Sequence, residues 1–315
     1  MSDKPKILVT GAGGFIGRRL VGKLLADGYP LRCLSRRKVA APSAGVENVI
    51  ADLLDPDSLG YSLNGIDTAY YLVHSLDAGE KDFAAKDRAA AGNFVAAAER
   101  AKLRRVIYLS GLGAHEELSD HLRSRHEVGE ILRRGRFATT VLRAAVIIGA
   151  GGSSFEMLRF LVRTQPVIPD LPGLRTPCQP IAVDNVIGYL AGCLNVEATA
   201  GETFDIGGPE ILSYREMLEH LAQVAGHVNL YFPTPVFSAW LTSRLIGLLS
   251  PVKSEVALAL LKGLNNEVVC RENRIRELIP EPLIPYDRAV ALALAEIARD
   301  KPRGMSSSET GKETP

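Results

Sequence analysis

A glycine-rich turn near the start of the chain, residues 11–17 (GAGGFIG), constrains the fold more than any other segment. It follows a short apolar run, residues 6–10 (KILVT), which is typical of a strand buried on both faces of a parallel sheet. It precedes residues 15–26, where apolar side chains recur at helical spacing and Gly28 fits the C-terminal cap. A strand, a glycine turn and a helix in this order predict the first unit of an α/β sheet.

The spacing of these glycines has a physical reason in each case. Gly11 permits the tight turn out of the strand, Gly13 or Gly14 allows a diphosphate to approach the backbone, and Gly17 lets the helix pack against the sheet. The start of the helix adds unpaired N–H groups and a partial positive charge. The sequence therefore predicts a dinucleotide-binding turn whose cofactor-binding residues are Gly11, Gly13, Gly14, Phe15, Ile16 and Gly17.

Strands and helices continue to alternate as far as residue 150. Strands are expected at residues 31–34, 49–51, 68–73, 106–109 and within 139–148, and helices at residues 86–101 and 122–133. This alternation predicts a doubly wound parallel Rossmann sheet in an α/β protein. Residues 1–150 form its nucleotide-binding domain, continued by residues 179–210. Residues 151–178 and 211–300 form a small, mostly C-terminal helical substrate-side subdomain, and residues 301–315 a disordered tail.

Charge and composition exclude several functions. The 315 residues carry a net charge of +1, so no overall field recruits nucleic acid. The four cysteines form no CxxC pair and lie away from histidines, which predicts free thiols and no metal site. The chain starts without a signal peptide, and no apolar run reaches the roughly 18 residues that span a bilayer. We therefore expect a cytoplasmic protein.

The end of the second strand indicates which nucleotide binds. NAD-specific sites place an acid there to bond the ribose 2′-hydroxyl, whereas this chain has Ser35, Arg36 and Arg37. A guanidinium can bind a 2′-phosphate through two hydrogen bonds, so we predict that NADP(H) is preferred and that NAD(H) is possible. Asp52, followed by Leu53, could accept a hydrogen bond from the adenine, or could cap the segment that follows it.

Several segments together resemble a known family. They are the glycine turn and residues 51–55 (ADLLD), 106–114 (VIYLSGLGA), 142–149 (LRAAVIIG) and 179–186 (QPIAVDNV). The chain is similar over residues 5–300 to the atypical and extended short-chain dehydrogenases/reductases. Within them it looks most like the NmrA-like and complex I 39-kDa-subunit-like NAD(P)-binding proteins, a group often labelled nucleoside-diphosphate-sugar epimerase. The resemblance implies that Leu72 and His74, after the fourth strand, and Ser110, after the fifth, border the nicotinamide.

The chain departs from that family at one functional position. Active members carry a Tyr-x-x-x-Lys pair on the helix after the fifth strand, and the spacing of four places both on one face. Here the corresponding positions hold His121 and Arg125, and no tyrosine lies between Tyr108 and Tyr189. The catalytic candidates are therefore Ser110, His121 and Arg125.

Two functions remain open at this stage. In the first, the protein is an oxidoreductase in which His121 transfers the proton, Arg125 holds the ribose and Ser110 polarises the carbonyl of an unknown small molecule. In the second, it binds NADP(H) without turnover, as a sensor, scaffold or assembly factor. A third and less favoured hypothesis uses the apolar residues 235–249 to contact a membrane or partner. Both a monomer and a homodimer agree with the sequence.

Overall fold

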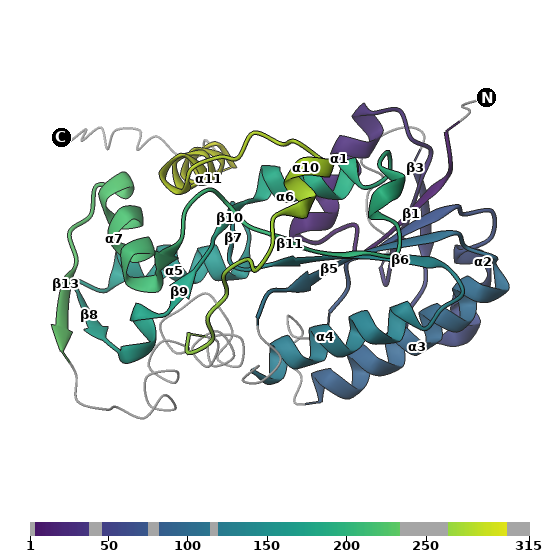
Figure 1. Ribbon diagram of the computed structural model, residues 1–315, viewed down its shortest axis with the longest axis horizontal. Helices are drawn as coiled ribbons and strands as arrows, with labels where there is room; N and C mark the ends of the chain where they lie inside the picture. Colours follow the sequence, from purple (N-terminus) through teal and green to yellow (C-terminus); the bar gives the residue numbers. More distant parts are fainter. Residues whose placement is uncertain (1–3, 38–45, 75–81, 114–118, 234–263, 301–315) are drawn as a thin grey trace, which may run out of the picture.

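A computed structural model describes residues 4–37, 46–74, 82–113, 119–233 and 264–300 of the chain. Its centre is a seven-stranded sheet with the order β11-β6-β5-β4-β1-β2-β3, in which every neighbouring pair is parallel (Figure 1). The strands are β1 (Ile7–Thr10), β2 (Leu31–Ser35), β3 (Val46–Ile50), β4 (Thr68–Tyr71), β5 (Arg105–Gly111), β6 (Ala138–Ala144) and β11 (Thr203–Ile206). The predicted doubly wound parallel sheet is confirmed.

Helices cover both faces of this sheet (Figure 1). Helices α3 (Phe83–Arg100) and α4 (Asp120–Arg133) pack side by side on one face, with the short α2 (Leu59–Ser62) near them. Helices α1 (Phe15–Ala26), α6 (Val183–Gly192) and α10 (Arg274–Leu278) lie on the other. Two separate apolar cores therefore form, which explains why the central strands are apolar on both faces.

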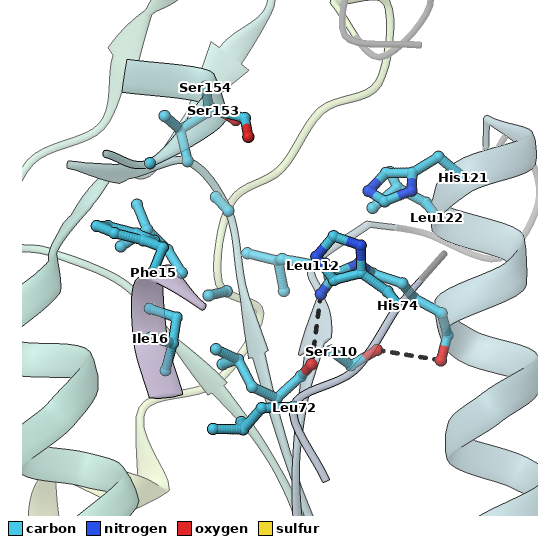
Figure 2. A pocket seen from close by; sticks show the side chains of 18 of the residues that line it. Phe15, Ile16, Leu72, His74, Ser110, Leu112, His121, Leu122, Ser153 and Ser154 are labelled. Carbon is cyan, nitrogen blue, oxygen red and sulfur yellow. Dashed lines mark hydrogen bonds between the residues drawn. The ribbon is translucent and has the colours of Figure 1, made fainter. Parts of the chain in front are cut away.

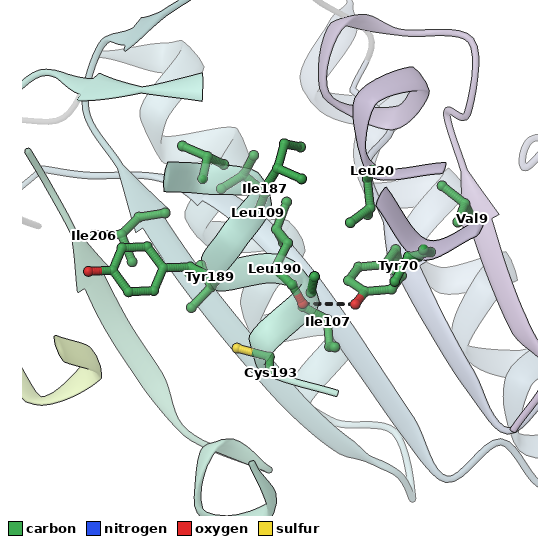
Figure 3. Packing of buried hydrophobic residues seen from close by; sticks show 14 of the residues in the cluster. Val9, Leu20, Tyr70, Ile107, Leu109, Ile187, Tyr189, Leu190, Cys193 and Ile206 are labelled. Atoms are coloured by element: carbon green, nitrogen blue, oxygen red, sulfur yellow. Dashed lines mark hydrogen bonds between the residues drawn. The ribbon is translucent and has the colours of Figure 1, made fainter. Parts of the chain in front are cut away.

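The core under α1 and α6 also ties distant segments together. Leu20 of α1, Leu190 of α6 and Ile107 of β5 belong to the same apolar core (Figure 3). The hydroxyl of Tyr70, which is fully buried, donates to the carbonyl oxygen of Leu190 at 2.8 Å. This buried phenol has a partner, so its burial costs little.

A second lobe continues from the carboxyl ends of the strands (Figure 1). Its helices are α5 (Ser153–Thr164), α7 (Tyr214–Ala225) and α11 (Tyr286–Asp300), which share a third apolar core. Three two-stranded sheets complete it: β7 (Ile147–Ile148) with β10 (Ile181–Ala182), β9 (Pro177–Cys178) with β12 (Leu212–Ser213), and β8 (Val167–Asp170) with β13 (Leu230–Pro233). The prolines of residues 166–180 therefore accompany short strands as well as turns.

The segment QPIAVDNV holds the two lobes together through buried amides. The Gln179 side chain donates to the Gly208 carbonyl at 2.8 Å and accepts from the Cys270 amide at 3.0 Å. Neither partner is near Gln179 in sequence. This part of the family resemblance therefore has a structural basis, because an unpaired buried amide would be costly.

Asn185, at the start of α6, makes a similar pair of bonds. Its side chain donates to the Pro282 carbonyl at 3.0 Å and accepts from the Ile284 amide at 2.9 Å. Asp184 beside it is exposed in the first turn of α6. It is therefore Asn185 that fastens the C-terminal segment to the helix.

The predicted elements agree closely with the structure up to residue 150. Helix α1 has the predicted bounds, while β3 begins three positions earlier than expected, at Val46 instead of Val49. The strand expected within residues 139–148 is split into β6 and β7. No helix in the described ranges is long and apolar enough to cross a membrane. Residues 235–249 and 301–315 lie outside those ranges.

Candidate functional site

The glycine turn lies where the order of strands reverses. Strand β1 pairs with β2 on one side and with β4 on the other, which is the position at which doubly wound sheets bind ligands. Gly11 has φ +65°, a left-handed conformation that favours glycine. A Cβ at Gly11 would lie 2.9 Å from the carbonyl oxygen of Leu72, so the turn packs closely against the end of β4.

Gly13 and Gly17 differ sharply in what surrounds them. A Cβ at Gly17 would lie 2.2 Å from the carbonyl oxygen of Gly11 and 2.8 Å from the Cα of Ala12, both backbone atoms. The close contact that requires Gly17 is therefore with the turn itself, which refines the predicted packing on the sheet. A Cβ at Gly13 would meet nothing within 4 Å, and Gly14 caps α1 without a side chain. Open space at Gly13 is what the approach of a diphosphate needs.

Leu72 is held in place by a side chain of β1. The Thr10 hydroxyl donates to the Tyr70 carbonyl at 3.1 Å and accepts from the Leu72 amide at 3.0 Å. Because Thr10 is fully buried at the end of β1, these bonds fix the two strand ends against each other. The predicted cofactor-side residue Leu72 thus has a defined position beside the glycine turn.

A cavity of about 370 Å³ starts at this turn. We call its first part the glycine end, formed by Gly11, Gly14, Phe15, Ile16, Gly17 and Leu72, and its second part the imidazole end, formed by His74, His121 and Arg125. Figure 2 shows Phe15 and Ile16 on one side of the cavity and the two imidazoles on the other. The second lobe covers it with Ser153, Ser154, Met157, Leu158, Tyr214, Leu264 and Val268.

Helix α4 places His121 and Arg125 together. The Ser119 hydroxyl caps the helix by accepting from the Leu122 amide, so His121 lies in the first turn and Arg125 one turn later. Both side chains line the cavity, as their spacing of four predicted. His74 joins them from the end of β4, with its ring centroid 6.3 Å from that of His121 and the ring planes at 72°.

Both imidazoles are neutral at physiological pH. Burial, and secondly the charge of Arg125, lowers the pKa of His121 from 6.5 to about 3. Burial, then Arg125 and then His121 lower the pKa of His74 well below 6.5. A neutral imidazole still donates one N–H hydrogen bond, but it is a poor source of a proton. His121 at the tyrosine position is therefore suited to hydrogen bonding.

The end of β5 is fastened to α4 below these groups. The hydroxyls of Tyr108 and Ser110 donate to the Arg125 carbonyl at 2.9 Å and 3.4 Å. His126 bonds the Gly111 carbonyl at 3.0 Å. Ser110 lines the cavity but is buried, with 3% of its surface exposed, and its hydroxyl points to the helix backbone. To contact a substrate carbonyl as predicted, the Ser110 hydroxyl must give up its 3.4 Å hydrogen bond to the Arg125 carbonyl.

The predicted 2′-phosphate residues form the turn that follows β2. Arg36 and Arg37 are exposed, and the Ser35 hydroxyl donates to the Arg37 carbonyl at 2.6 Å, which closes the turn. Two exposed cations thus stand at the end of β2, next to the strand that carries the glycine turn.

The residues after β3 are more strongly engaged in local structure. The Asp52 carboxylate accepts from the Leu54 amide at 2.9 Å, so it closes a local turn. The expected cap of the following segment is supplied by Asp55 instead, which accepts from the Asp57 amide at 3.2 Å. Leu53 is buried in the core, and its carbonyl accepts from the Asn93 side chain at 2.9 Å. A nucleotide contact at Leu53 would therefore involve its backbone.

Sequence reasoning missed several cavity residues that the second lobe contributes. Tyr214, Leu264 and Val268 line the cavity from segments that carry no motif. Met157 is buried, with 5% of its surface exposed, and it lines the cavity as well. The Ser213–Glu216 capping box predicts that a helix starts at Tyr214, but only the fold brings that residue to the cavity. Among the described residues, no group of three potential metal ligands exists.

Residues 11–147 match the model of a family described as NAD(P)H-binding. Divinyl chlorophyllide a 8-vinyl-reductase of Oryza sativa is 25% identical over 250 residues, which cover 73% of this chain and 61% of that protein. The (4-alkanoyl-5-oxo-2,5-dihydrofuran-3-yl)methyl phosphate reductase of Streptomyces griseus is 28% identical over 224 residues, which cover 70% and 74%. The chain thus spans about three fifths of the length of the plant enzyme.

Solved structures share the fold. A triphenylmethane reductase of Citrobacter, complexed with NADP(H), has a TM-score of 0.74 at 19% identity, with 91% of this chain and 99% of that chain covered. A nucleoside-diphosphate-sugar epimerase of Staphylococcus aureus has a TM-score of 0.74 at 14% identity, with the same coverage. The chain therefore has a Rossmann fold, and its residues 11–147 are similar to a family described as NAD(P)H-binding. Its fold is that of these epimerase and reductase structures, as the short-chain dehydrogenase/reductase resemblance predicted, and the relatives named above are reductases.

Proposed function

We propose that the protein is an NADP(H)-dependent oxidoreductase of the atypical short-chain dehydrogenase/reductase type, which transfers hydride between the cofactor and a small, largely apolar molecule. The observation that carries this proposal is the continuity of the cavity. It runs from the glycine end to the imidazole end beneath apolar side chains of the second lobe. A protein that only bound a nucleotide would not need a covered apolar chamber beside the cofactor's reactive ring.

The preference for NADP(H) rests on charge at the end of β2. Arg36 and Arg37 supply two exposed guanidinium groups, and no acid occupies the adjoining positions of the strand end. A carboxylate there would repel a 2′-phosphate, while a guanidinium forms charge-assisted hydrogen bonds with it. Binding of NADP(H) by a triphenylmethane reductase of the same fold supports this choice.

At the imidazole end, His121 acts as a neutral hydrogen-bond donor to the reacting group. Arg125 supplies positive charge, and Ser110 lies at the end of β5 within the same cavity. In these roles, groups that stabilise charge take the place of a tyrosine that gives up a proton. The names of the related reductases support reduction as the direction of the reaction.

A nucleotide titration tests the cofactor half of the proposal. Calorimetry with NADPH, NADP⁺, NADH and NAD⁺ should show that the protein binds NADPH and NADP⁺ most tightly. Arg36→Ala should weaken NADPH binding by about 1–3 kcal/mol through loss of a charge-assisted contact, and should leave NADH unchanged. Arg163→Ala, at an exposed arginine of α5, is the matched control. Binding of none of the four nucleotides would refute the proposal.

One observation favours a second candidate, a sensor or scaffold that binds NADP(H) without turnover. The position of the usual catalytic tyrosine holds His121, whose pKa of about 3 leaves the imidazole without an acidic proton at physiological pH. Tight nucleotide binding, combined with no oxidation of NADPH across a panel of dyes, enones, aldehydes and quinones, would favour this candidate.

A further inference from the structure

The cavity has an unusual distribution of charge. In the described part of the chain, no aspartate or glutamate lines it, and Arg125 is the one lining residue with a permanent charge. The two imidazoles beside it are neutral, and the rest of the lining is apolar, backbone or hydroxyl. An apolar chamber with one uncompensated cation favours a ligand that carries negative charge where it meets the arginine.

The contacts of Arg125 leave that charge available. One Nη donates to the Leu109 carbonyl at 3.4 Å, which is a long hydrogen bond. Its Nε is buried and has no hydrogen-bond partner among the described residues. Its Cδ lies over Gly111, 3.5 Å from where a Cβ would stand, so the side chain extends along the end of β5. The guanidinium therefore lies at the reacting end of the cavity.

Among the described residues that line the cavity, none is a good proton donor, and the Tyr108 hydroxyl already donates to the Arg125 carbonyl at 2.9 Å. Burial raises the pKa of Tyr108 to about 12, although Arg125 lowers it in part, and burial raises the pKa of Tyr214 well above 10. Reduction of an isolated carbonyl forms an alkoxide, a strong base that needs a proton as hydride arrives. Hydride addition to an alkene that is conjugated to a carbonyl group forms an enolate instead. This weaker base can persist beside a cation until solvent protonates it.

We propose that the substrate is an apolar alkene conjugated to a carbonyl group, and that Arg125 binds the enolate oxygen formed by hydride addition. This inference rests on the proposed oxidoreductase function. Hydride from NADPH forms the new C–H bond at the β-carbon, and the alkene electron pair moves to leave the negative charge on the carbonyl oxygen. NADPH becomes NADP⁺, and the α-carbon then takes a proton from solvent to give the saturated carbonyl compound. Arg125 acts by stabilising the charge that develops.

A binding experiment tests the charge preference without turnover. The protein–NADP⁺ complex is titrated by calorimetry with cinnamate, an anion, and with cinnamamide, its neutral counterpart. The wild type should bind cinnamate at least about tenfold more tightly, and Arg125→Met should lose that preference. Arg123→Met removes the same charge from the exposed side of α4 and should retain it. Equal or undetectable binding of both compounds by the wild type overturns the inference.

A turnover experiment tests the reaction class. With NADPH, the enzyme should reduce benzylideneacetone to benzylacetone and go no further. Arg125→Met should lower kcat by about 100-fold, as loss of an oxyanion donor does, with the KM for NADPH changed less than about threefold. Arg125→Lys should recover part of kcat.

The outcomes separate this inference from the proposed function. Faster reduction of benzylacetone, or of the cationic dye crystal violet, would overturn the inference and leave the oxidoreductase standing. Failure to bind any nucleotide would refute both the inference and the proposed oxidoreductase function. If nucleotides bind and none of the three compounds is reduced, the cinnamate preference and its loss in Arg125→Met decide the inference alone.

Discussion

The two ends of the cavity are built by different means. The glycine end is made of backbone, and its geometry depends on the absence of side chains at Gly11 and Gly17. The imidazole end is made of side chains from β4 and α4, whose charge states depend on burial and on Arg125. A backbone site tolerates few residue types, so its function can be read from sequence. A side-chain site can change its chemistry by exchanging one residue on an unchanged helix.

The largest effect is expected from Gly17→Ala. Its Cβ would lie 2.2 Å from the Gly11 carbonyl oxygen, so backbone must move. We expect the free energy of unfolding to fall by about 3 kcal/mol or more, and nucleotide binding to be lost as well. Gly22→Ala on the same helix meets nothing within 4 Å and should stabilise the protein by about 0.5–1 kcal/mol. Thermal unfolding measures the stability of the two variants, and titration with NADPH measures their binding. Equal stability of the two variants would contradict the close contact of Gly17 with the glycine turn.

Gly13→Ala should separate folding from binding at the glycine end. A methyl group at Gly13 has open space in this structure, so the free energy of unfolding should stay within about 0.5 kcal/mol of wild type. The same methyl would occupy the place that a diphosphate needs, and NADPH affinity should fall by at least about tenfold. Unchanged affinity in a stable Gly13→Ala protein would place the diphosphate elsewhere.

A pH profile examines the imidazole end. Because His121 is neutral above a pKa of about 3, turnover should show no inflection from it between about pH 5 and about pH 8. His121→Gln, which keeps an N–H donor, should retain most of kcat, whereas His121→Phe should lose about tenfold. An inflection near pH 6.5 that disappears in His121→Gln would instead assign proton transfer to the imidazole.

The smallest effect is expected far from both ends, at the other edge of the sheet. Glu47 bonds Lys6 at 2.6 Å and Arg32 at 2.9 Å, and although burial opposes ionisation, these two cations lower its pKa from 4.5 to about 2. The carboxylate therefore stabilises the fold above pH 4.5, and this contribution is lost as pH falls towards about 2.

The stability difference between wild type and Glu47→Gln should thus shrink over that acid range, as denaturant melts at stepped pH would show. Glu130→Gln, at an exposed position of α4, is the control and should change little. NADPH affinity at neutral pH should be the same in both variants, since neither residue lines the cavity.

The fold could be predicted from sequence where local patterns decide structure. The buried strand before Gly11 and the helical period after it suffice for the first unit, and the same alternation carries the sheet as far as β6. The pairing of Leu142 with Phe204 places β11 beside β6, and that neighbour depends on packing between distant segments. Periodicity along one segment does not reveal such a distant partner.

The candidate site, like the fold, could be predicted from sequence only in part. The spacing of His121 and Arg125 predicted that both would line one cavity, and they do. The third member of that end, His74, could be placed only by the family resemblance, and its lowered pKa depends on burial that the sequence does not show. Gln179 and Asn185 carry buried hydrogen bonds to distant residues, and the segment QPIAVDNV that holds them gives no sign of these partners in its sequence.

The pairing of β6 with β11 also orders events during synthesis. The edge of β6 remains open until residues 203–206 have left the ribosome, and an open parallel edge is a place where a nascent chain can associate wrongly. The glycine end needs only β1, α1 and β4, which emerge early. We therefore expect the glycine end to form first, and the cavity to be completed only after Tyr214, Leu264 and Val268 have been made.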